Sequence, residues 1–261
     1  MLGSESAAAL PVFHFAGLRI NPLTVDQTIA ALTARDPAAP FATYTTPNIE
    51  HIYHRHRNAE FDQACESSFL STNDSRILHR FGKLAGLEFQ FAPGAYVVDR
   101  LFRQTIRPDD ALCVIGGDQD LMDRVRTQFG LKQLAHHVPP MGMIRNDDAV
   151  RAAIDFIVAH PSRYVFIAMG PPQSEQFCRR VIADGRATGI GLCIGSSFTV
   201  LTGQINPAPA WMEKSGMVWL YRLIKEPSRL WRRYLVRGVY GVGRCVGAAL
   251  AVRLGGGQSV A

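Results

Sequence analysis

The 261-residue chain lacks the short motifs that identify many enzymes. It has no G-x-x-x-x-G-K-[ST] phosphate loop, no complete G-x-G-x-x-G turn and no G-x-S-x-G nucleophile turn. His51, His54 and His56 lie close together, but no carboxylate pattern accompanies them, so we expect no metal site there. These absences argue against a P-loop NTPase, a common serine hydrolase and a His-ligated metalloenzyme.

The chain also lacks a C-x-x-C pair, and its number of cysteines, 5, is odd. Cys113 and Cys193 lie within apolar runs. We therefore expect buried free thiols in a reducing compartment rather than a disulfide framework. The first apolar stretch is not preceded by basic residues, so no secretory signal is expected.

Long hydrophobic runs are absent as well. The chain has no run of about 18 apolar residues, which predicts that no helix spans a membrane. The nearest candidate, residues 238–254, is interrupted by Arg244 and Arg253. Such a segment is better suited to lying on a membrane surface than to crossing the bilayer.

The charge of the chain is uneven along its length. A hydrophobic fraction of 47% supports a sizeable core, and the net charge is +6, with a large share of the positive charge beyond Lys214. A basic C-terminal end favours an anionic partner such as nucleic acid, a membrane surface or a phosphorylated substrate. The other predicted strand ends lack basic residues, which disfavours nucleic acid.

Short apolar runs alternate with amphipathic stretches over most of the chain. We expect strands at 41–46, 67–72, 111–117, 134–140, 163–170 and 189–195. Helical spacing lies between them, and Asp120 and Asp147 are the expected N-caps of two of these helices. This alternation predicts an α/β fold, a mostly parallel Rossmann-like sheet with helices on both faces.

The alternation stops near residues 205–215, where a basic tail begins. We expect residues 1–205 to form the α/β core and residues 206–261 to form a helical appendage that associates with a membrane. In the segment WLYRLIKEPSRLWRRYL (219–235), a helix would separate aromatic and apolar side chains from basic ones. Pro227 should break or bend it. The alternative is a helix packed on the core with a solvated basic rim.

Parallel sheets bind ligands beyond the carboxyl ends of their strands, so polar residues at those ends are the candidate site. Asp74 follows the second strand, and its carboxylate is either an N-cap or a general base. Thr46 and Asn48 follow the first strand and either cap a helix or bind a ligand.

Two further turns are candidates for ligand binding. Gly116 and Gly117 precede a helix N-terminus, which makes either a phosphate site or a plain tight turn, and Asp118 would repel an anion there. Gln173 and Glu175 open the helix after the fifth strand, where acidic residues are common for helix-dipole reasons alone.

These turns, in this order, resemble the WecG/TagA/CpsF family of bacterial glycosyltransferases. The C-terminal sequence INPAPAWM followed by WLYRLIKEPSRLWRRYL is similar to the end of that family almost residue for residue. TPNIEH, VIGGDQDLMDRV, MGPPQSEQF and IGSSFTVLTG resemble its other elements, and Asn73 with Asp74 resembles the start of its D-G-x-G element. The chain departs from the pattern at Ser75, Ile77, Phe91, Tyr96, Ser174, Thr199 and Pro207.

The resemblance implies inverting transfer of a sugar from a UDP-sugar to a polyprenyl-pyrophosphate-linked acceptor at the cytoplasmic face of the membrane. It implies no essential metal and no cofactor. It gives Asp74 the role of general base and places Thr46 and Asn48 in the pocket. Asn73, Gly116, Gly117, Gln173 and Glu175 are further expected substrate contacts. The tail arginines would bind diphosphate and an anionic membrane surface; they are Arg222, Arg229, Arg232 and Arg233.

Two other interpretations remain. The departures from the family pattern allow a non-catalytic homologue that binds a nucleotide-sugar or a membrane and serves as a partner subunit. A nucleic-acid-binding α/β protein with a basic tail is the second. The family resemblance also implies a homo-oligomer formed through the α/β core, although the sequence carries no interface signature.

Overall fold

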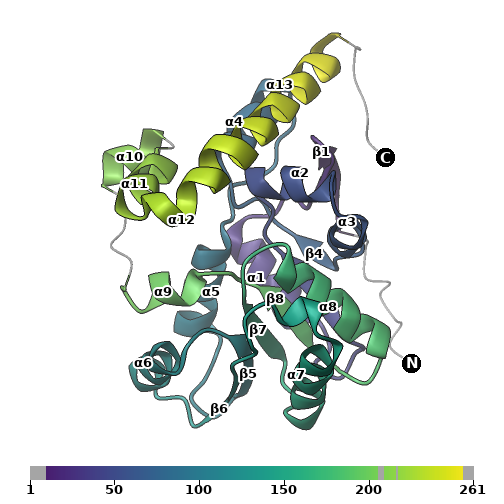
Figure 1. Cartoon of the computed structure of the whole chain (residues 1–261), viewed down its shortest axis with the longest axis vertical. Coiled ribbons are helices and arrows are strands. Elements are labelled where there is room, and N and C mark those ends of the chain that lie inside the picture. Colours follow the sequence, from purple (N-terminus) through teal and green to yellow (C-terminus); the bar gives the residue numbers. More distant parts are fainter. Residues whose placement is uncertain (1–9, 205–208, 216, 255–261) are drawn as a thin grey trace, which may run out of the picture.

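The structure, a computed structural model, describes residues 10–204, 209–215 and 217–254. Its centre is a six-stranded sheet in the order β4-β3-β8-β7-β5-β6, and every pairing within it is parallel (Figure 1). The strands are β3 (Ala42–Thr45), β4 (Leu70–Ser71), β5 (Ala111–Gly116), β6 (Gln133–His137), β7 (Tyr164–Ala168) and β8 (Ile190–Cys193). Each lies within or overlaps an expected strand, which confirms the α/β prediction.

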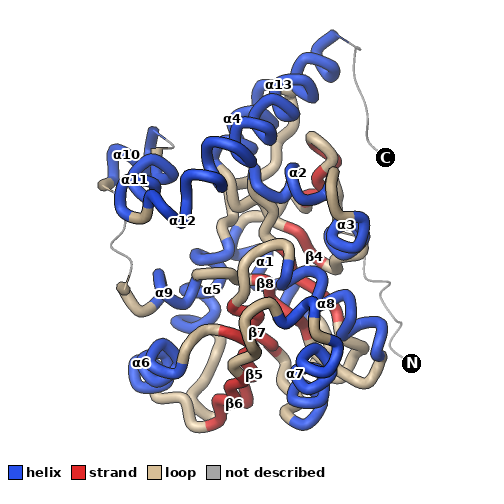
Figure 2. The backbone as a smooth tube through the Cα atoms, in the orientation of Figure 1, coloured by secondary structure: helices blue, strands red, loops and turns tan. Residues whose placement is uncertain are grey.

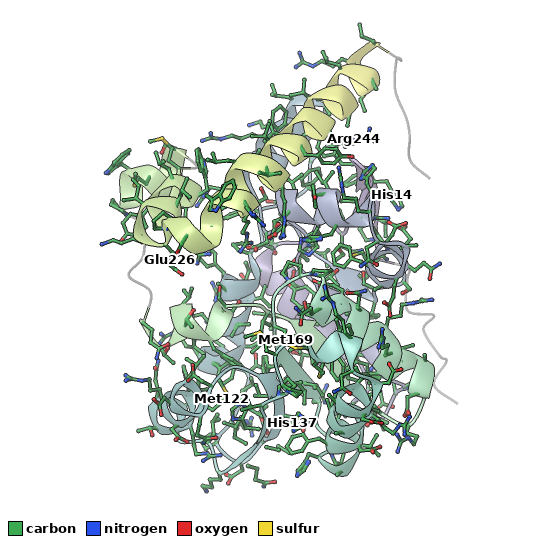
Figure 3. The ribbon with its side chains drawn as sticks, viewed as in Figure 1. His14, Met122, His137, Met169, Glu226 and Arg244 are labelled. Atoms are coloured by element: carbon green, nitrogen blue, oxygen red, sulfur yellow. The ribbon has the colours of Figure 1, made fainter. Side chains whose placement is uncertain are left out.

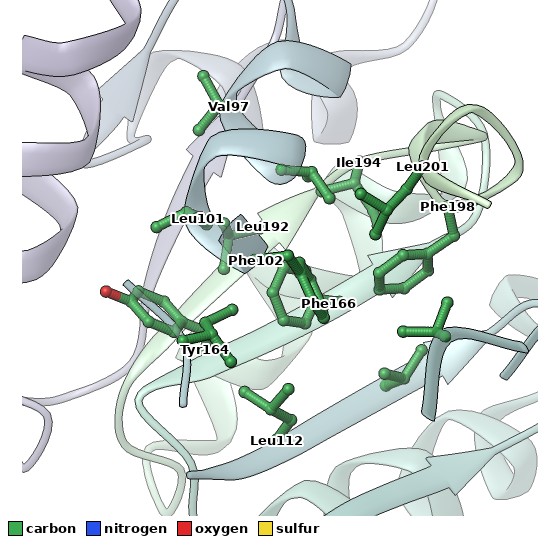
Figure 4. Close-up of a cluster of buried hydrophobic side chains, with 14 of the residues drawn as sticks. Val97, Leu101, Phe102, Leu112, Tyr164, Phe166, Leu192, Ile194, Phe198 and Leu201 are labelled. Atoms are coloured by element: carbon green, nitrogen blue, oxygen red, sulfur yellow. The ribbon is translucent and has the colours of Figure 1, made fainter. Parts of the chain in front are cut away.

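Helices cover both faces of this sheet because alternate strand residues point to opposite sides. Leu112 and Val114 of β5 belong to one buried cluster, whereas Cys113 and Ile115 belong to another. Figure 4 shows the first cluster, where Phe102, Phe166 and Phe198 meet. It is covered by α1 (Val25–Ala34), α5 (Gly94–Gln104), α6 (Gln119–Phe129) and α9 (Ser197–Leu201). The second is covered by α7 (Asp147–Ala159) and α8 (Gln173–Asp184), with the short η1 (Met143–Arg145) beside them.

A third buried cluster joins the two ends of the chain. It contains the antiparallel hairpin of β1 (Phe13–Phe15) and β2 (Leu18–Ile20), together with α2 (Ile49–Arg55), α4 (Arg76–Leu84) and α13 (Val239–Leu254). Cys245 and Ala249 of α13 are buried in it. Figure 2 shows α13 lying across α4 and α2, and α3 (Ala59–Glu66) completes this side of the molecule. The last helix is therefore packed on the core along one of its sides.

The tail before α13 is helical and is bent at a proline, as expected. It consists of α10 (Ala210–Ser215), α11 (Val218–Lys225), α12 (Pro227–Trp231) and the π-helical η2 (Arg232–Gly238). α11 ends at Lys225, and Pro227 is the first residue of α12, where its missing N–H costs no hydrogen bond. The boundary predicted between residues 205 and 206 falls outside the described residues and stays a prediction.

The tail also contains a long apolar helix. Within the described ranges, Arg232–Leu254 is long and apolar enough to cross a membrane by length and composition alone. η2 extends α13 in the N-terminal direction, which makes this helix longer than the stretch 238–254 considered from the sequence. The expectation that no helix spans a membrane stays a prediction. Only 17% of the most apolar window is buried, and Val246, Leu250 and Leu254 are exposed on its outer side.

The N-caps of two helices differ from those expected from the sequence, whereas the state of the cysteines agrees with the expectation. Asp118 and Asn146, not Asp120 and Asp147, are the N-caps of α6 and α7, because each helix begins earlier than expected. The cysteines are free and buried, as predicted: Cys65, Cys113, Cys178, Cys193 and Cys245.

Candidate active site

A cavity of about 860 Å³ lies between the C-terminal edge of the large sheet and the tail. Residues following every strand of that sheet except β6 line it, and α11, α12, η2 and α13 close it on the opposite side. Figure 3 labels Met169, which follows β7 near the centre of the molecule, and Glu226, at the bend between α11 and α12. The tail thus supplies one wall of the pocket.

Asp74 lies at the end of β4 and faces this pocket. Ser75, and not Asp74, is the N-cap of α4, since its hydroxyl accepts from the Leu78 N–H at 3.2 Å. The Asp74 carboxylate instead accepts a hydrogen bond from the backbone N–H of Gly94, the first residue of α5. A Cβ at Gly94 would lie 3.0 Å from Thr46 Cγ2, so glycine lets the start of α5 pack closely against Thr46. Asp74 is therefore not the N-cap of α4.

The ionisation of Asp74 is set by two opposing effects. Burial raises its pKa to about 6, because a charged carboxylate loses hydration in the pocket. Arg233 and Arg222, both from the tail, act in the opposite direction, as do His51 and the Gly94 N–H. Asp74 is thus a carboxyl group that ionises near neutral pH in a pocket with two nearby guanidinium groups.

Behind Asp74 lies a buried hydrogen-bond chain that joins α2 to α8. Asn48 caps α2, and its Oδ1 accepts from the Glu50 N–H at 2.9 Å. The Asn48 N–H donates to His51 Nδ1 at 3.3 Å, so His51 Nε2 carries the proton that it shares with Glu175 Oε1, also at 3.3 Å. Ser174 donates to the other oxygen of Glu175 at 2.8 Å. This series of hydrogen bonds fixes the Asn48 and Glu175 side chains in the pocket wall.

Glu50, buried on the same helix, connects the core to the tail. Its carboxylate pairs with Arg233 Nε at 2.7 Å and Arg237 Nη1 at 2.6 Å, and it lies 3.5 Å from His54 Nε2. Burial acts to raise the pKa of Glu50, but the hydrogen bond from His54 and the two arginines outweigh burial and lower it to about 2. The ionised carboxylate therefore holds η2 against α2, and with it the Arg233 side chain near Asp74.

Replacing Glu50 with glutamine should lower the free energy of unfolding by about 2 kcal/mol, between the values typical of exposed and buried ion pairs. The loss follows because Arg233 and Arg237 keep their charges without the carboxylate. Urea unfolding at pH 7 measures it. Glu66→Gln is the matched control, because Glu66 pairs with His14 and Arg55 at an exposed site and should cost less than 1 kcal/mol. Equal effects of the two variants would contradict a special role for Glu50.

The predicted contacts divide into those that line the pocket and those that do not. The lining includes Thr46, Asn48, Asp74, Gly117, Glu175, Arg222 and Arg233. Asn73 is fully buried, and its side chain bonds to the Gln90 carbonyl and the Ser75 N–H instead. Gly116, Gln173 and Arg232 lie outside the lining, and the side chain of Arg229 is outside the described part of the chain.

The glycine turn after β5 has the geometry of a tight turn. Gly116 and Gly117 have φ values of 89° and 75°, which favour glycine. Asp118 caps the following helix by accepting from the Leu121 N–H at 2.8 Å, so a carboxylate already occupies the helix N-terminus. This favours the tight-turn interpretation over a phosphate site.

Sequence reasoning missed Glu50 and considered His51 only as a metal ligand. Both lie in TPNIEH, directly after a strand, and an acid in a first helical turn is unremarkable on its own. Among the residues that the structure describes, no group of three or more His, Cys, Asp or Glu side chains is placed to hold a metal ion. His51 has Glu175 as its partner, and His54 lies beside Glu50.

The site combines a large pocket at the strand ends of a parallel sheet with a carboxyl group that ionises near neutral pH and with two nearby arginines. These are features of an α/β enzyme that acts on an anionic substrate. The comparison with known proteins is more specific. The model of the "Glycosyl transferase WecG/TagA/CpsF family" matches residues 13–253, from β1 to the end of α13. The chain belongs to this family of glycosyltransferases, as its motifs indicated.

Proposed function

We propose that the protein is an inverting, metal-independent glycosyltransferase. It moves a hexosyl or N-acetylhexosaminyl group from a UDP-sugar to a polyprenyl-pyrophosphate-linked acceptor during bacterial exopolysaccharide, capsule or cell-wall glycan synthesis. The observation that carries this proposal is the position of Asp74, which lies in the pocket between the core and two arginines of the tail.

In this proposal Asp74 is the general base. An acceptor hydroxyl is a weak nucleophile until its proton is partly removed, and a positioned carboxylate contributes about 10²–10⁴-fold to that step. The hydroxyl oxygen then forms the new glycosidic bond as the bond between the sugar and UDP breaks. UDP leaves with the bonding electron pair, and Asp74 takes the proton.

The leaving diphosphate gains negative charge as its bond to the sugar breaks, and that charge needs a counter-charge. Arg222 and Arg233 line the pocket and act electrostatically on Asp74, so they are within range of a substrate held there. Thr46 and Asn48 also line the pocket, and Asn48 is held by the hydrogen bond from its backbone N–H to His51 Nδ1 and by the Glu50 N–H, which donates to its Oδ1. Thr46 and Asn48, together with Gly117 and Glu175 of the lining, are the proposed substrate contacts from the core.

The tail has a second proposed role at the cytoplasmic face of the plasma membrane. Leu230, Tyr234 and Leu235 line the pocket, and Trp231 and part of Leu235 are exposed to solvent on the same tail segment. Each basic residue near an anionic surface contributes about 1 kcal/mol to binding, so the tail could hold the enzyme where its lipid-linked acceptor is found. The outer side of α13 adds exposed apolar area.

Replacing Val246 and Leu250 together with glutamate should abolish flotation of the protein with vesicles that contain phosphatidylglycerol. Both side chains are exposed, at 41% and 52%, so the charges should leave the fold intact while making insertion into the headgroup layer unfavourable. Met141→Glu is the control, because Met141 is fully exposed on a distant loop. A double variant that floats like the wild type would show that α13 does not face the membrane.

Transfer of label from a panel of UDP-sugars to lipid-pyrophosphate-linked acceptors tests the reaction class. A non-catalytic homologue is the alternative, because the chain departs from the family pattern at several positions, Ser75 and Thr199 among them. Absence of transfer with every donor, in the presence of membranes and the intact tail, would favour that alternative.

A further inference from the structure

Arg76, the first residue of α4, lines the pocket, and the proposed reaction gives it no role. Its Cζ atom lies 4.4 Å from the centroid of the Phe91 ring, in a cation–π contact. No carboxylate of the described chain is within ion-pair distance of it. The contact with Phe91 holds the guanidinium group at the pocket wall, and no carboxylate of the described chain competes for its N–H groups.

The ring system extends beyond Phe91. Tyr96 meets Phe91 edge to face, with centroids 6.2 Å apart and planes at 81°. Tyr96 also lines the pocket and is 45% exposed, so part of an aromatic surface lies next to the guanidinium. An aromatic face binds the apolar face of a sugar or base ring, and a guanidinium binds a carboxylate or phosphate in bidentate fashion.

The other pocket arginines differ from Arg76 in their surroundings. Arg233 is paired with Glu50 at 2.7 Å, and both Arg233 and Arg222 lower the pKa of Asp74. Arg222 and Arg233 come from the tail, whereas Arg76 comes from the core and contacts Phe91, another residue of the core. The pocket thus has a cationic group on its core side in addition to the two on its tail side.

We propose that Arg76, Phe91 and Tyr96 form a specificity subsite for a substrate ring that carries an anionic group. The anion is bound by the free edge of Arg76, the ring lies against Tyr96, and Phe91 positions the guanidinium. The anion is either a diphosphate or the carboxylate of an acidic sugar. This inference rests on the proposed glycosyltransferase function. Phe91 and Tyr96 are also positions where the chain departs from the family pattern, which makes the subsite a property of this chain.

The test is the Arg76→Gln variant of the full-length protein. Calorimetry gives its Kd for UDP, UDP-glucose and UDP-glucuronic acid, and kinetics give its KM for a pyrophosphate-linked acceptor. Loss of a charge-assisted hydrogen bond should weaken binding of the ligand that uses Arg76 about 10- to 100-fold. Tyr96→Leu should weaken the same ligand, and Lys83→Gln, which removes an exposed charge from the same helix, should change nothing.

The pattern of losses identifies the anion. Equal losses for all three nucleotides indicate the donor diphosphate, a loss confined to UDP-glucuronic acid indicates an acidic sugar, and an increase in the acceptor KM alone indicates the acceptor diphosphate. If the wild type binds and transfers but Arg76→Gln matches it throughout, the subsite is refuted and the proposed function stands. If the wild type binds no nucleotide and transfers nothing, both the subsite and the proposed function are refuted.

Discussion

Replacing Asp74 with asparagine is expected to reduce sugar transfer at least a hundredfold. The amide keeps the shape of the side chain but cannot take a proton from the acceptor hydroxyl, and general-base catalysis contributes about 10²–10⁴-fold. The measurement is transfer of label from the best UDP-sugar to a lipid-pyrophosphate-linked acceptor, with wild type and variant at equal concentration. Transfer that survives the substitution would keep the reaction class and remove Asp74 as its base.

The pH dependence of the wild type provides an independent check on the same residue. Only the ionised carboxylate can act as a base, so kcat/KM should fall as the pH drops through about 6. An ordinary aspartate has a pKa of about 3.9 and would leave activity unchanged down to pH 5. An acid limb near pH 4 would contradict the environment that the structure gives to Asp74.

The stability of the Asp74→Asn variant separates a catalytic effect from misfolding. The folded pKa of about 6 lies above the unfolded value, so ionisation of Asp74 destabilises the fold as the pH rises. At pH 8 the neutral amide should therefore gain roughly 2–3 kcal/mol, a gain that shrinks below pH 6 and disappears near pH 4. Urea unfolding at pH 8 and pH 5 measures it. A variant that is both inactive and less stable would point to a damaged fold.

The second large effect is expected at Gly241, where α13 crosses α2. A Cβ at this position would lie 2.5 Å from Ile49 Cγ2 and 2.6 Å from the Ile49 carbonyl oxygen, which is backbone and cannot rotate away. Gly241→Ala should therefore weaken docking of the tail by about 1–3 kcal/mol, or about fivefold to a hundredfold. Trypsin should cut faster at Arg233 and Arg237, and sugar transfer should fall in parallel, because the tail forms one wall of the pocket.

The matched control is Gly247→Ala on the same helix. Nothing lies within 4 Å of a Cβ at Gly247, and alanine is favoured over glycine in a helix by up to about 1 kcal/mol. This variant should keep its activity and resist trypsin at least as well as the wild type. If both variants lose activity equally, the effect lies in the helix itself and not in its contact with Ile49.

The large sheet could be predicted from the sequence because its strands are buried on both faces and appear as uninterrupted apolar runs. β5 and β7 are examples, with only their ends exposed to solvent or pocket. The hairpin of β1 and β2 was not predicted, because its strands have three residues each and no Asn-Gly or Asp-Gly turn joins them. The N-caps of α6 and α7 were predicted wrongly because several acidic or amide side chains lie close together at the start of each helix.

The position of Asp74 was predictable from strand–helix alternation, but its environment was not. Burial in the pocket raises its pKa, and Arg222 and Arg233, which lie far away in the sequence, act to lower it. The contact of Glu50 with Arg233 has the same origin, since no local pattern links a helix after the first sheet strand to the C-terminal segment. Long-range ion pairs of this kind arise from tertiary packing alone.

The two tail arginines near Asp74 also couple the position of the tail to the proton balance of the pocket. Arg233 and Arg222 favour the ionised carboxylate, whereas burial, which is the larger effect, favours the neutral acid. Moving the tail away removes the two guanidinium groups and also opens the pocket to water, and these two changes shift the pKa of Asp74 in opposite directions. Any net change in this pKa on docking of the tail must be matched, by thermodynamic reciprocity, by a dependence of docking on pH. The position of the tail and the protonation of the base are therefore linked properties of one pocket.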